Sequence, residues 1–532
     1  MGSGGSVSRR RFLELVAAAG AGSLVLPLAG CSDSDAGDVP DAAKTTVSPV
    51  EPAPAGAFPD GVMAGEPRPD GAVIWTRVSQ DGEAAAWEVA TDDTFATIVA
   101  GGTVLADPER DGTTHVVVDS LEPDSWYRYR FVTDAGASPT GRLRTAPAPG
   151  AQTERLRFAY CSCQQINDSL YVAHRAMAAE PDLDFFVHLG DYIYVSDEET
   201  LTLADYRGVY HRFKANPLLQ QLQATVPIVA MFDDGEFYNG VDRTGDPERL
   251  TAALDAWFEA FPVLPVDGEP HRAYRTVPWG GLADLFMLDV RQYRDPAVAS
   301  DDTDDPEGAQ MLAGGRTTLG GPQKQWLLDG LSTSAAAWRL FGNPYNMTMT
   351  RLEDRDPGPP RPPGVQPGAG TYYPNEAWDD YSAERRDILE FIHDQGVGDV
   401  VSFSGHTHVW IAGQLQPDPD DPASPVVAFD VTCGSLTADP DLLLAEGSNP
   451  DAERAKYRAL ESTGLELNPH LSYLNFIDQG YGLVEVTPEA TLVELKLIDP
   501  YDEAAESAVG ARAVIERGAT AIPVERFADT ER

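Results

Sequence analysis

The chain has 532 residues, of which 42% are hydrophobic, and its 84 acidic and 39 basic side chains give a formal net charge of −45. This length and composition indicate a globular protein of several domains and exclude a disordered or fibrous chain. Such an acidic surface repels phosphate backbones and anionic lipid headgroups, which argues against nucleic-acid binding and against electrostatic attachment to a membrane.

The first 31 residues have the pattern of an export signal. Residues 8–13 (SRRRFL) form a twin-arginine motif, and the apolar stretch 15–28 is too short and too rich in Ala and Gly to span a bilayer stably. Residues 28–31 (LAGC) resemble the lipobox of prokaryotic lipoproteins, in which the signal is removed before the Cys and the Cys is lipidated. We therefore expect export by the twin-arginine machinery, an extracytoplasmic location and membrane attachment only through a lipid on Cys31. The alternative is an incidental thiol in a discarded signal.

Two further segments precede the part of the chain that carries chemistry. Residues 32–56 are rich in Pro, Ala, Ser and Asp and cannot bury enough apolar area to fold, so they predict a disordered tether. Residues 57–147 contain short apolar runs with a period of two, separated by turn residues, which predicts a small β-sandwich. These runs are 72–77, 85–90, 115–118 and 126–131.

Residues 148–532 have a different pattern and predict a catalytic α/β domain. Near-continuous apolar runs alternate with helix-like stretches, as in sheets that are covered on both faces. The apolar runs are 156–160, 185–189, 227–232, 285–288, 400–403 and 426–429.

Polar residues with metal-ligand chemistry follow four of these runs. They are the segments 161–164 (CSCQ), 190–194 (GDYIY), 233–236 (DDGE) with Asn239, and 405–408 (GHTH). Because ligands gather at the carboxyl ends of parallel strands, we expect the S, O and N donors to converge. Mixed donors suit a transition or trivalent ion beside a harder divalent ion, so the sequence predicts a multinuclear metal site. Cys161 and Cys163 could instead form a disulfide after export.

The ordered motifs resemble those of the PhoD-type alkaline phosphatases and phosphodiesterases, within the calcineurin-like metallophosphoesterase superfamily. The resemblance extends from about residue 58 to residue 487 and includes the segments 58–62, 65–67, 74–77, 162–164, 188–194, 206–207, 233–234, 288–294, 319–327 and 378–381. It implies a four-layer α/β/β/α metallophosphoesterase sandwich preceded by the small all-β domain. It also implies a hydrolase in which a metal-bound hydroxide attacks a phosphate monoester or diester.

The resemblance implies a role for each matched residue. Cys163 matches a thiolate ligand, Asp191 the bridging carboxylate and Tyr194 a phenolate suited to ferric iron. The remaining expected ligands are Asp234, Asn239 and His408. The implied cofactors are ferric iron and calcium, or another divalent metal such as manganese or zinc. Asp191 and Asp234 are thus also catalytic candidates.

Arg291 is the third catalytic candidate. A guanidinium at this edge of the sheet could clamp the non-bridging oxygens of the phosphate bidentately. The alternative is a structural salt bridge to Asp289 or Asp295.

The chain departs from the family pattern at two positions. Gly235 replaces a histidine that normally stabilises transition-state charge or protonates the leaving group, and losing such a donor costs on the order of 10²–10³ in rate. His188, His211 and Asp233 are possible substitutes for it. His406 replaces an aspartate and is expected to act as a second imidazole ligand, which shifts the preference from calcium toward zinc, manganese or iron.

Two other functions stay open at this point. The first is a phosphodiesterase or phospholipase D-like enzyme that acts on diesters of the cell envelope. The second is a non-catalytic lipoprotein that binds metal or phosphate, which Gly235 suggests. The Pro- and Gly-rich residues 354–370 predict either a lid near the site or a disordered surface loop. Cys433 predicts a buried, unreactive thiol.

Overall fold

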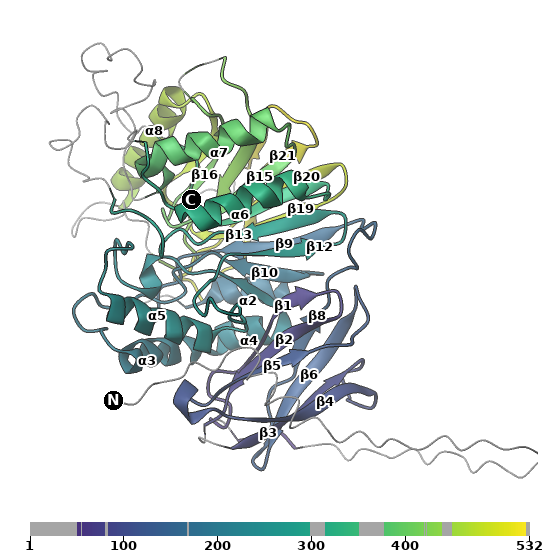
Figure 1. Cartoon of the computed structure of the whole chain (residues 1–532). Helices are drawn as coiled ribbons and strands as arrows, with labels where there is room; N and C mark the ends of the chain where they lie inside the picture. Colours follow the sequence, from purple (N-terminus) through teal and green to yellow (C-terminus); the bar gives the residue numbers. More distant parts are fainter. Residues whose placement is uncertain are drawn as a thin grey trace, which may run out of the picture.

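The computed structural model describes residues 51–54, 56–79, 83–166, 170–297, 314–350, 377–419, 421, 423–438 and 450–527 (Figure 1). The predicted export signal with Cys31, most of the predicted tether and the predicted lid at 354–370 lie outside the described residues. Among the described residues, every helix is too short or too polar to span a lipid bilayer.

Two sheets form the N-terminal all-β domain. One contains β1 (Val62–Arg68), β2 (Gly71–Arg77) and β5 (Thr113–Val118). The other contains β3 (Ala84–Ala90), β4 (Ile98–Leu105), β6 (Trp126–Thr133), β7 (Gly136–Ala137) and β8 (Gly141–Arg144). Alternate apolar side chains of both sheets, such as Ile74 and Tyr129, share one buried core. The predicted all-β domain is confirmed.

Two larger sheets form the centre of the molecule. The first has ten strands in the order β22-β21-β20-β19-β9-β10-β11-β1-β2-β5 and so continues into the N-terminal domain. Its further strands are β9 (Leu156–Cys161), β10 (Phe185–His188), β11 (Ile228–Ala230), β19 (Gly480–Val486), β20 (Ala490–Leu497), β21 (Ala508–Glu516) and β22 (Val524–Arg526).

The second sheet has seven strands in the order β12-β13-β14-β15-β17-β16-β18. They are β12 (Arg275–Trp279), β13 (Ala283–Met287), β14 (Trp338–Tyr345), β15 (Val400–Gly405), β16 (Trp410–Leu415), β17 (Ala428–Thr432) and β18 (Leu471–Asn475). The two sheets face each other across a buried core, in which the ring of Phe403 lies 5.3 Å from that of Phe158.

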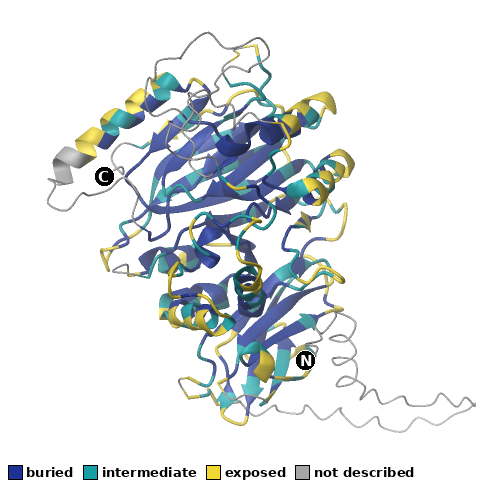
Figure 2. Ribbon diagram, turned by 60° about the vertical axis from the view of Figure 1, so that its left-hand side comes forward, coloured by how far each residue is buried: buried dark blue, intermediate teal, exposed yellow. Residues whose placement is uncertain are grey.

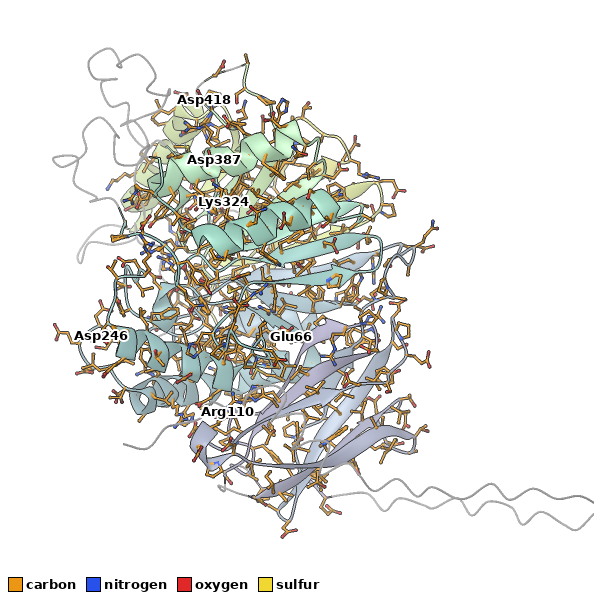
Figure 3. All side chains as sticks on the ribbon, viewed as in Figure 1. Glu66, Arg110, Asp246, Lys324, Asp387 and Asp418 are labelled. Carbon is orange, nitrogen blue, oxygen red and sulfur yellow. The ribbon has the colours of Figure 1, made fainter. Side chains whose placement is uncertain are left out.

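Helices cover the outer faces of both sheets, which gives four layers (Figures 1 and 2). The ten-stranded sheet is covered by α2 (Val172–Ala179), α3 (Leu203–Lys214), α4 (Pro217–Thr225) and α5 (Pro247–Ala260). The seven-stranded sheet is covered by α6 (Gly320–Thr333) and α7 (Ser382–Asp394), and α8 (Pro450–Leu467) packs near β18. Lys324 of α6 and Asp387 of α7, labelled in Figure 3, form an ion pair at 2.9 Å. The predicted α/β/β/α fold is confirmed.

The N-terminal domain contacts the α/β part of the chain through strand pairing and polar contacts. Gly65 of β1 pairs with Ile228 of β11 in a parallel register. Glu66 forms an ion pair with Arg275 at 2.6 Å, and Arg110 donates to the carbonyl of Phe258 at 3.3 Å (Figure 3). The two domains therefore share a continuous sheet as well as a packed interface.

Candidate metal centre

The candidate site lies where parallel strands of the two facing sheets end. Strands β9, β10 and β11 run parallel in the first sheet, and β15 runs parallel to β14 and β17 in the second. Cys163 follows β9, Asp191 follows β10, and Asp233 and Asp234 follow β11. His406 and His408 follow β15. The four predicted strand ends therefore meet at one site.

The first group of donors contains sulfur, oxygen and nitrogen. Ligand atoms of Cys163, Asp191 and His408 all lie within 4.8 Å of one another. The hydroxyl of Tyr194 donates to Asp191 Oδ2 at 3.2 Å and lies 3.0 Å from His408 Nε2. We call Cys163, Asp191, Tyr194 and His408 the sulfur-containing set.

The second group of donors contains only oxygen and nitrogen. Ligand atoms of Asp191, Asp233, Asp234 and His406 lie within 4.8 Å of one another. His406 Nδ1 lies 2.9 Å from Asp233 Oδ2 and 3.8 Å from Asp234 Oδ1. We call these four residues the carboxylate set. Asp191 belongs to both sets, which is the position of a carboxylate that bridges two cations.

Four of these residues have left-handed backbone conformations. The φ angles are 60° at Cys163, 54° at Asp191, 71° at His406 and 55° at His408. Each such conformation costs a non-glycine residue on the order of 1–3 kcal/mol and tends to occur at functional sites. The backbone is therefore locally strained at the residues whose side chains converge on the site.

Backbone amides fix the orientation of the shared carboxylate and its loop. The N–H of Gly235 donates to Asp191 Oδ1 at 2.8 Å. Glu236 Oε2 accepts the N–H groups of Asp191 and Asp233, both at 2.9 Å, and its Oε1 accepts that of Tyr192 at 2.8 Å. One buried carboxylate therefore ties the loop after β10 to the loop after β11.

Without bound cations, the close packing of several acidic groups in the two donor sets is electrostatically unfavourable. Burial, together with the neighbouring charges of Asp233 and Asp234, raises the pKa of Asp191 to about 7. Burial and the charge of Asp191 raise the pKa of the Cys163 thiol to about 12. Buried groups of this kind are held as anions when they coordinate metal ions.

The donor chemistry fits two different cations. A thiolate, a phenolate and an imidazole suit a transition or trivalent ion, whereas carboxylates with one imidazole suit a divalent ion. The sulfur-containing set would hold the first ion and the carboxylate set the second. Of the ligands expected from the sequence, the structure brings together Cys163, Asp191, Tyr194, Asp234, His406 and His408.

Asn239 is the expected ligand that the structure does not bring to the cluster. Its side chain is exposed, and its Nδ2 lies 3.5 Å from Asp197 Oδ2. The backbone continues toward the site, because the N–H of the following residue, Gly240, donates to Asp234 Oδ2 at 3.2 Å. Asn239 therefore lies at the outer edge of the carboxylate set.

Arg291 lies inside the site and makes neither of the salt bridges considered from the sequence. Its side chain is 0% exposed, its Nε donates to Asp233, and its Nη2 lies 3.6 Å from Asp234 Oδ1. Asp289 accepts the backbone N–H of Arg291 at 3.1 Å and is also bound by Gln292, and Asp295 pairs with Arg243. Although burial alone raises the pKa of Asp233, the charge of Arg291 holds it well below its usual range.

Asp233 is the residue of the carboxylate set that was not predicted as a ligand. The pattern of two consecutive acids after an apolar run was the available signal, but it did not show which acid points inward. Of the other suggested substitutes for the missing histidine, His188 packs against the ring of Tyr192, and its pKa falls to about 3 because it is buried. His211 pairs with Asp111 at the domain junction.

Gly235 has no room for a side chain. A Cβ atom at this position would lie 2.5 Å from the carbonyl oxygen of Ile193 and 2.7 Å from Asp191 Oδ1. Both neighbours are held in place, the first as backbone and the second by hydrogen bonds. One of the atoms that leaves no space at Gly235 is Asp191 Oδ1, which is also the atom that accepts the Gly235 N–H.

Comparisons with known proteins identify the family of this chain. The model of the PhoD-like phosphatase family matches residues 158–495, and the model of the PhoD-like phosphatase N-terminal domain matches residues 43–147. This chain belongs to the PhoD-like phosphatase family. It is 30% identical over 495 residues to alkaline phosphatase D of Bacillus subtilis (strain 168), which covers 86% of this chain and 80% of that protein.

Solved structures agree with this assignment. A structure of PhoD matches with a TM-score of 0.77 and 28% identity, over 88% of this chain and 92% of that chain. A purple acid phosphatase from yellow lupin seeds, PPD1, matches with a TM-score of 0.52 and 12% identity, over 85% of this chain and 75% of that chain, and so shares the fold. The PhoD-like phosphatase described here is therefore a phosphoesterase of the alkaline phosphatase D type, and the resemblance found in the sequence is confirmed.

Proposed function

We propose that this PhoD-like phosphatase is an exported, metal-dependent hydrolase that uses water to cleave phosphate esters, with two cations that share Asp191. The observation that carries the proposal is the membership of Asp191 in both donor sets. The sulfur-containing set would hold ferric iron, because thiolate and phenolate ligands suit that ion. The carboxylate set would hold a divalent ion, and the imidazole of His406 favours manganese, zinc or iron over calcium.

The cations would supply Lewis-acid stabilisation of the phosphoryl group and a water molecule of lowered pKa. The residues of the chain hold and orient this arrangement. Asp191 fixes the separation of the two donor sets, and the Gly235 N–H fixes the carboxylate of Asp191. Arg291 keeps Asp233 ionised from the buried side of the site. Tyr194, His406 and His408 are partly exposed, so the substrate approaches from their side.

The lack of a proton-donating side chain at Gly235 indicates which leaving groups the enzyme can release. No side chain at this position can donate a proton to a departing alkoxide, and the neighbouring contacts leave no space for one. Esters with good leaving groups depend least on such a donor. This favours activated esters over simple alkyl esters, and the phosphodiesterase that acts on diesters of the cell envelope stays the alternative function.

The location is proposed from the sequence of the first 31 residues. The twin-arginine motif and the lipobox ending at Cys31 support export in the folded state and a lipid anchor on the extracytoplasmic side. Export after folding would allow the metals to bind before the protein crosses the membrane.

Metal analysis combined with a panel of mono- and diester substrates tests the proposal. We expect two metal ions per chain, one of them iron, and a visible charge-transfer absorption from the Tyr194 phenolate that disappears in Tyr194→Phe. Protein with both metals bound that hydrolyses neither class of ester would instead support the non-catalytic metal- or phosphate-binding lipoprotein.

A further inference from the structure

A pocket at the junction of the two domains lies apart from the metal centre. It is bordered by the end of β2, the turn before β5, and helices α3 and α5. Its free space admits a guest of about the size of a water molecule or a halide ion. Its lining includes Asp60, Arg77, Asp111, Arg207, Tyr210, His211, Lys214 and Glu259.

Every acidic side chain of this lining already has its own basic partner. Arg77 pairs with Asp60 at 2.6 Å, and Arg207 pairs with Glu259 at 2.7 Å. His211 pairs with Asp111. The remaining ionisable cation is Lys214, and no ion pair in the described part of the chain includes it.

The groups that contact the ammonium of Lys214 directly are uncharged. The side chain is 0% exposed, and its Nζ lies 4.9 Å from the ring centres of Trp75 and Tyr192 and 4.6 Å from that of Phe261. Its polar contacts are long, at 3.4 Å to Tyr192 Oη and 3.5 Å to Met63 Sδ. An ammonium group without a counter-ion is costly to bury, and aromatic faces compensate only part of that cost.

Tyr210 provides a second unused polar group beside Lys214. The two residues are four positions apart on α3, so both side chains emerge from the same face of the helix. Tyr210 Oη is buried and has no hydrogen-bond partner among the residues that the structure describes. A phenolic hydroxyl can donate to an anion, whereas a second cation would be repelled here.

We propose that the junction pocket binds a small monovalent anion of the halide class, held by the ammonium of Lys214 and the hydroxyl of Tyr210. The anion supplies a counter-charge in direct contact with Lys214, because no carboxylate of the described residues forms an ion pair with it. It also links the two domains, because Lys214 contacts Trp75 of the N-terminal domain and Tyr192 of the loop that carries Asp191.

The titration of Lys214 is consistent with this geometry. Burial lowers its pKa to about 7, the charge of Arg77 acts in the same direction, and the charge of Asp60 opposes both. The other titratable and charged groups around it are Asp111, His115, His188, Tyr192, Arg207, Tyr210, His211 and Glu259. A bound anion favours the charged ammonium, so binding should take up protons above neutral pH.

The test is thermal unfolding of the full, metal-loaded chain at about pH 8, in sodium chloride or bromide against sodium gluconate of equal ionic strength. Gluconate is a six-carbon carboxylate and is much larger than a halide ion. We expect the halides to raise the Tm by about 1–3 °C in the wild type and much less in Lys214→Met and Tyr210→Phe. Crystals soaked in bromide should show anomalous scattering between Lys214 Nζ and Tyr210 Oη.

Lys324→Met is the matched control, because it removes a lysine charge on α6 whose partner is Asp387 and leaves the pocket intact. It should keep the full response to halides. Tyr210→Phe retains the ring and folds with minimal disturbance, so it tests the site even if Lys214→Met is unstable. An equal halide response in wild type and Tyr210→Phe, or no bromide at the pocket, overturns the proposal.

Discussion

The carboxylate of Glu236 accepts the backbone N–H of Asp191 at 2.9 Å and so holds the loop that carries the shared ligand. The same carboxylate accepts the N–H groups of Tyr192 and Asp233. Burial and the charge of Asp191 together raise the pKa of Glu236 well above its usual value. The residue is therefore tolerated at an electrostatic cost because it positions two ligand loops at once.

Replacing Glu236 by Gln should weaken metal binding without removing a ligand. The amide nitrogen of Gln would face a backbone N–H that the carboxylate now accepts, and leaving such a donor unsatisfied costs about 1–3 kcal/mol. Partners that orient ligands typically contribute 10–100-fold to metal affinity. We expect a decrease of that size, measured by metal titration, with activity restored at high metal concentration.

Glu516→Gln is the control for this variant, because Glu516 is exposed at the end of β21. It should leave metal affinity and activity unchanged. Unaltered metal affinity in Glu236→Gln would show that the hydrogen bonds of Glu236 do not position the site.

Gly235→Ala should impair the site, and Gly235→His should not create a better enzyme. The new Cβ would press against Ile193 and Asp191, so the carboxylate of Asp191 must turn away from the Gly235 N–H. We expect at least a 10-fold loss in kcat/KM and a lower content of the second metal. Gly208→Ala, in α3 with open space around its Cα, should instead raise stability by about 0.5–1 kcal/mol. Higher turnover in Gly235→His would contradict the packing described here.

Arg291→Gln should destabilise the protein as well as reduce activity. The substitution leaves the buried carboxylate of Asp233 without its cationic partner, and breaking a buried ion pair typically costs about 3–5 kcal/mol. Chemical denaturation should show this loss, and the double variant Asp233→Asn with Arg291→Gln should recover part of it. If Arg291→Gln changed only KM, Arg291 would be a substrate clamp, as first considered from the sequence.

The pH dependence of stability should report Lys214 directly. Its pKa is about 7 in the folded chain because of burial, against about 10.4 when unfolded. Between these values the unfolded chain binds more protons, so stability rises with pH, by up to about 4 kcal/mol. In halide-free buffer, the free energy of unfolding of wild type relative to Lys214→Met should increase from about pH 7 to pH 10. A constant difference across this range would show that Lys214 is not buried as described.

Much of the fold could be predicted because its signals are local. The apolar runs at 156–160, 185–189 and 400–403 became strands β9, β10 and β15, and ligands followed each of them as parallel topology requires. The strands near the C-terminus, β18 to β22, were not predicted individually. In β20 and β21 the side chains alternate between buried and partly exposed positions, which gives a weaker pattern than a fully buried run.

The finer features of the site depend on long-range packing, which a single sequence does not reveal. The partner of Arg291 is Asp233, 58 positions away, and not the nearby Asp289 or Asp295. Asn239 lies close to the ligands in sequence, but its side chain turns outward to Asp197. The lack of space at Gly235 comes from the loop after β10, so the sequence suggested a missing group where the structure shows a close contact.

The metal content of Asp191→Asn tests the shared carboxylate most directly. The account predicts two metal ions per wild-type chain and no more than one in the variant. It also predicts a fall in kcat of about 10³-fold or more, because several kcal/mol of transition-state stabilisation depend on the pair of cations. A variant that still binds two metal ions and retains its activity would contradict the claim that Asp191 holds both.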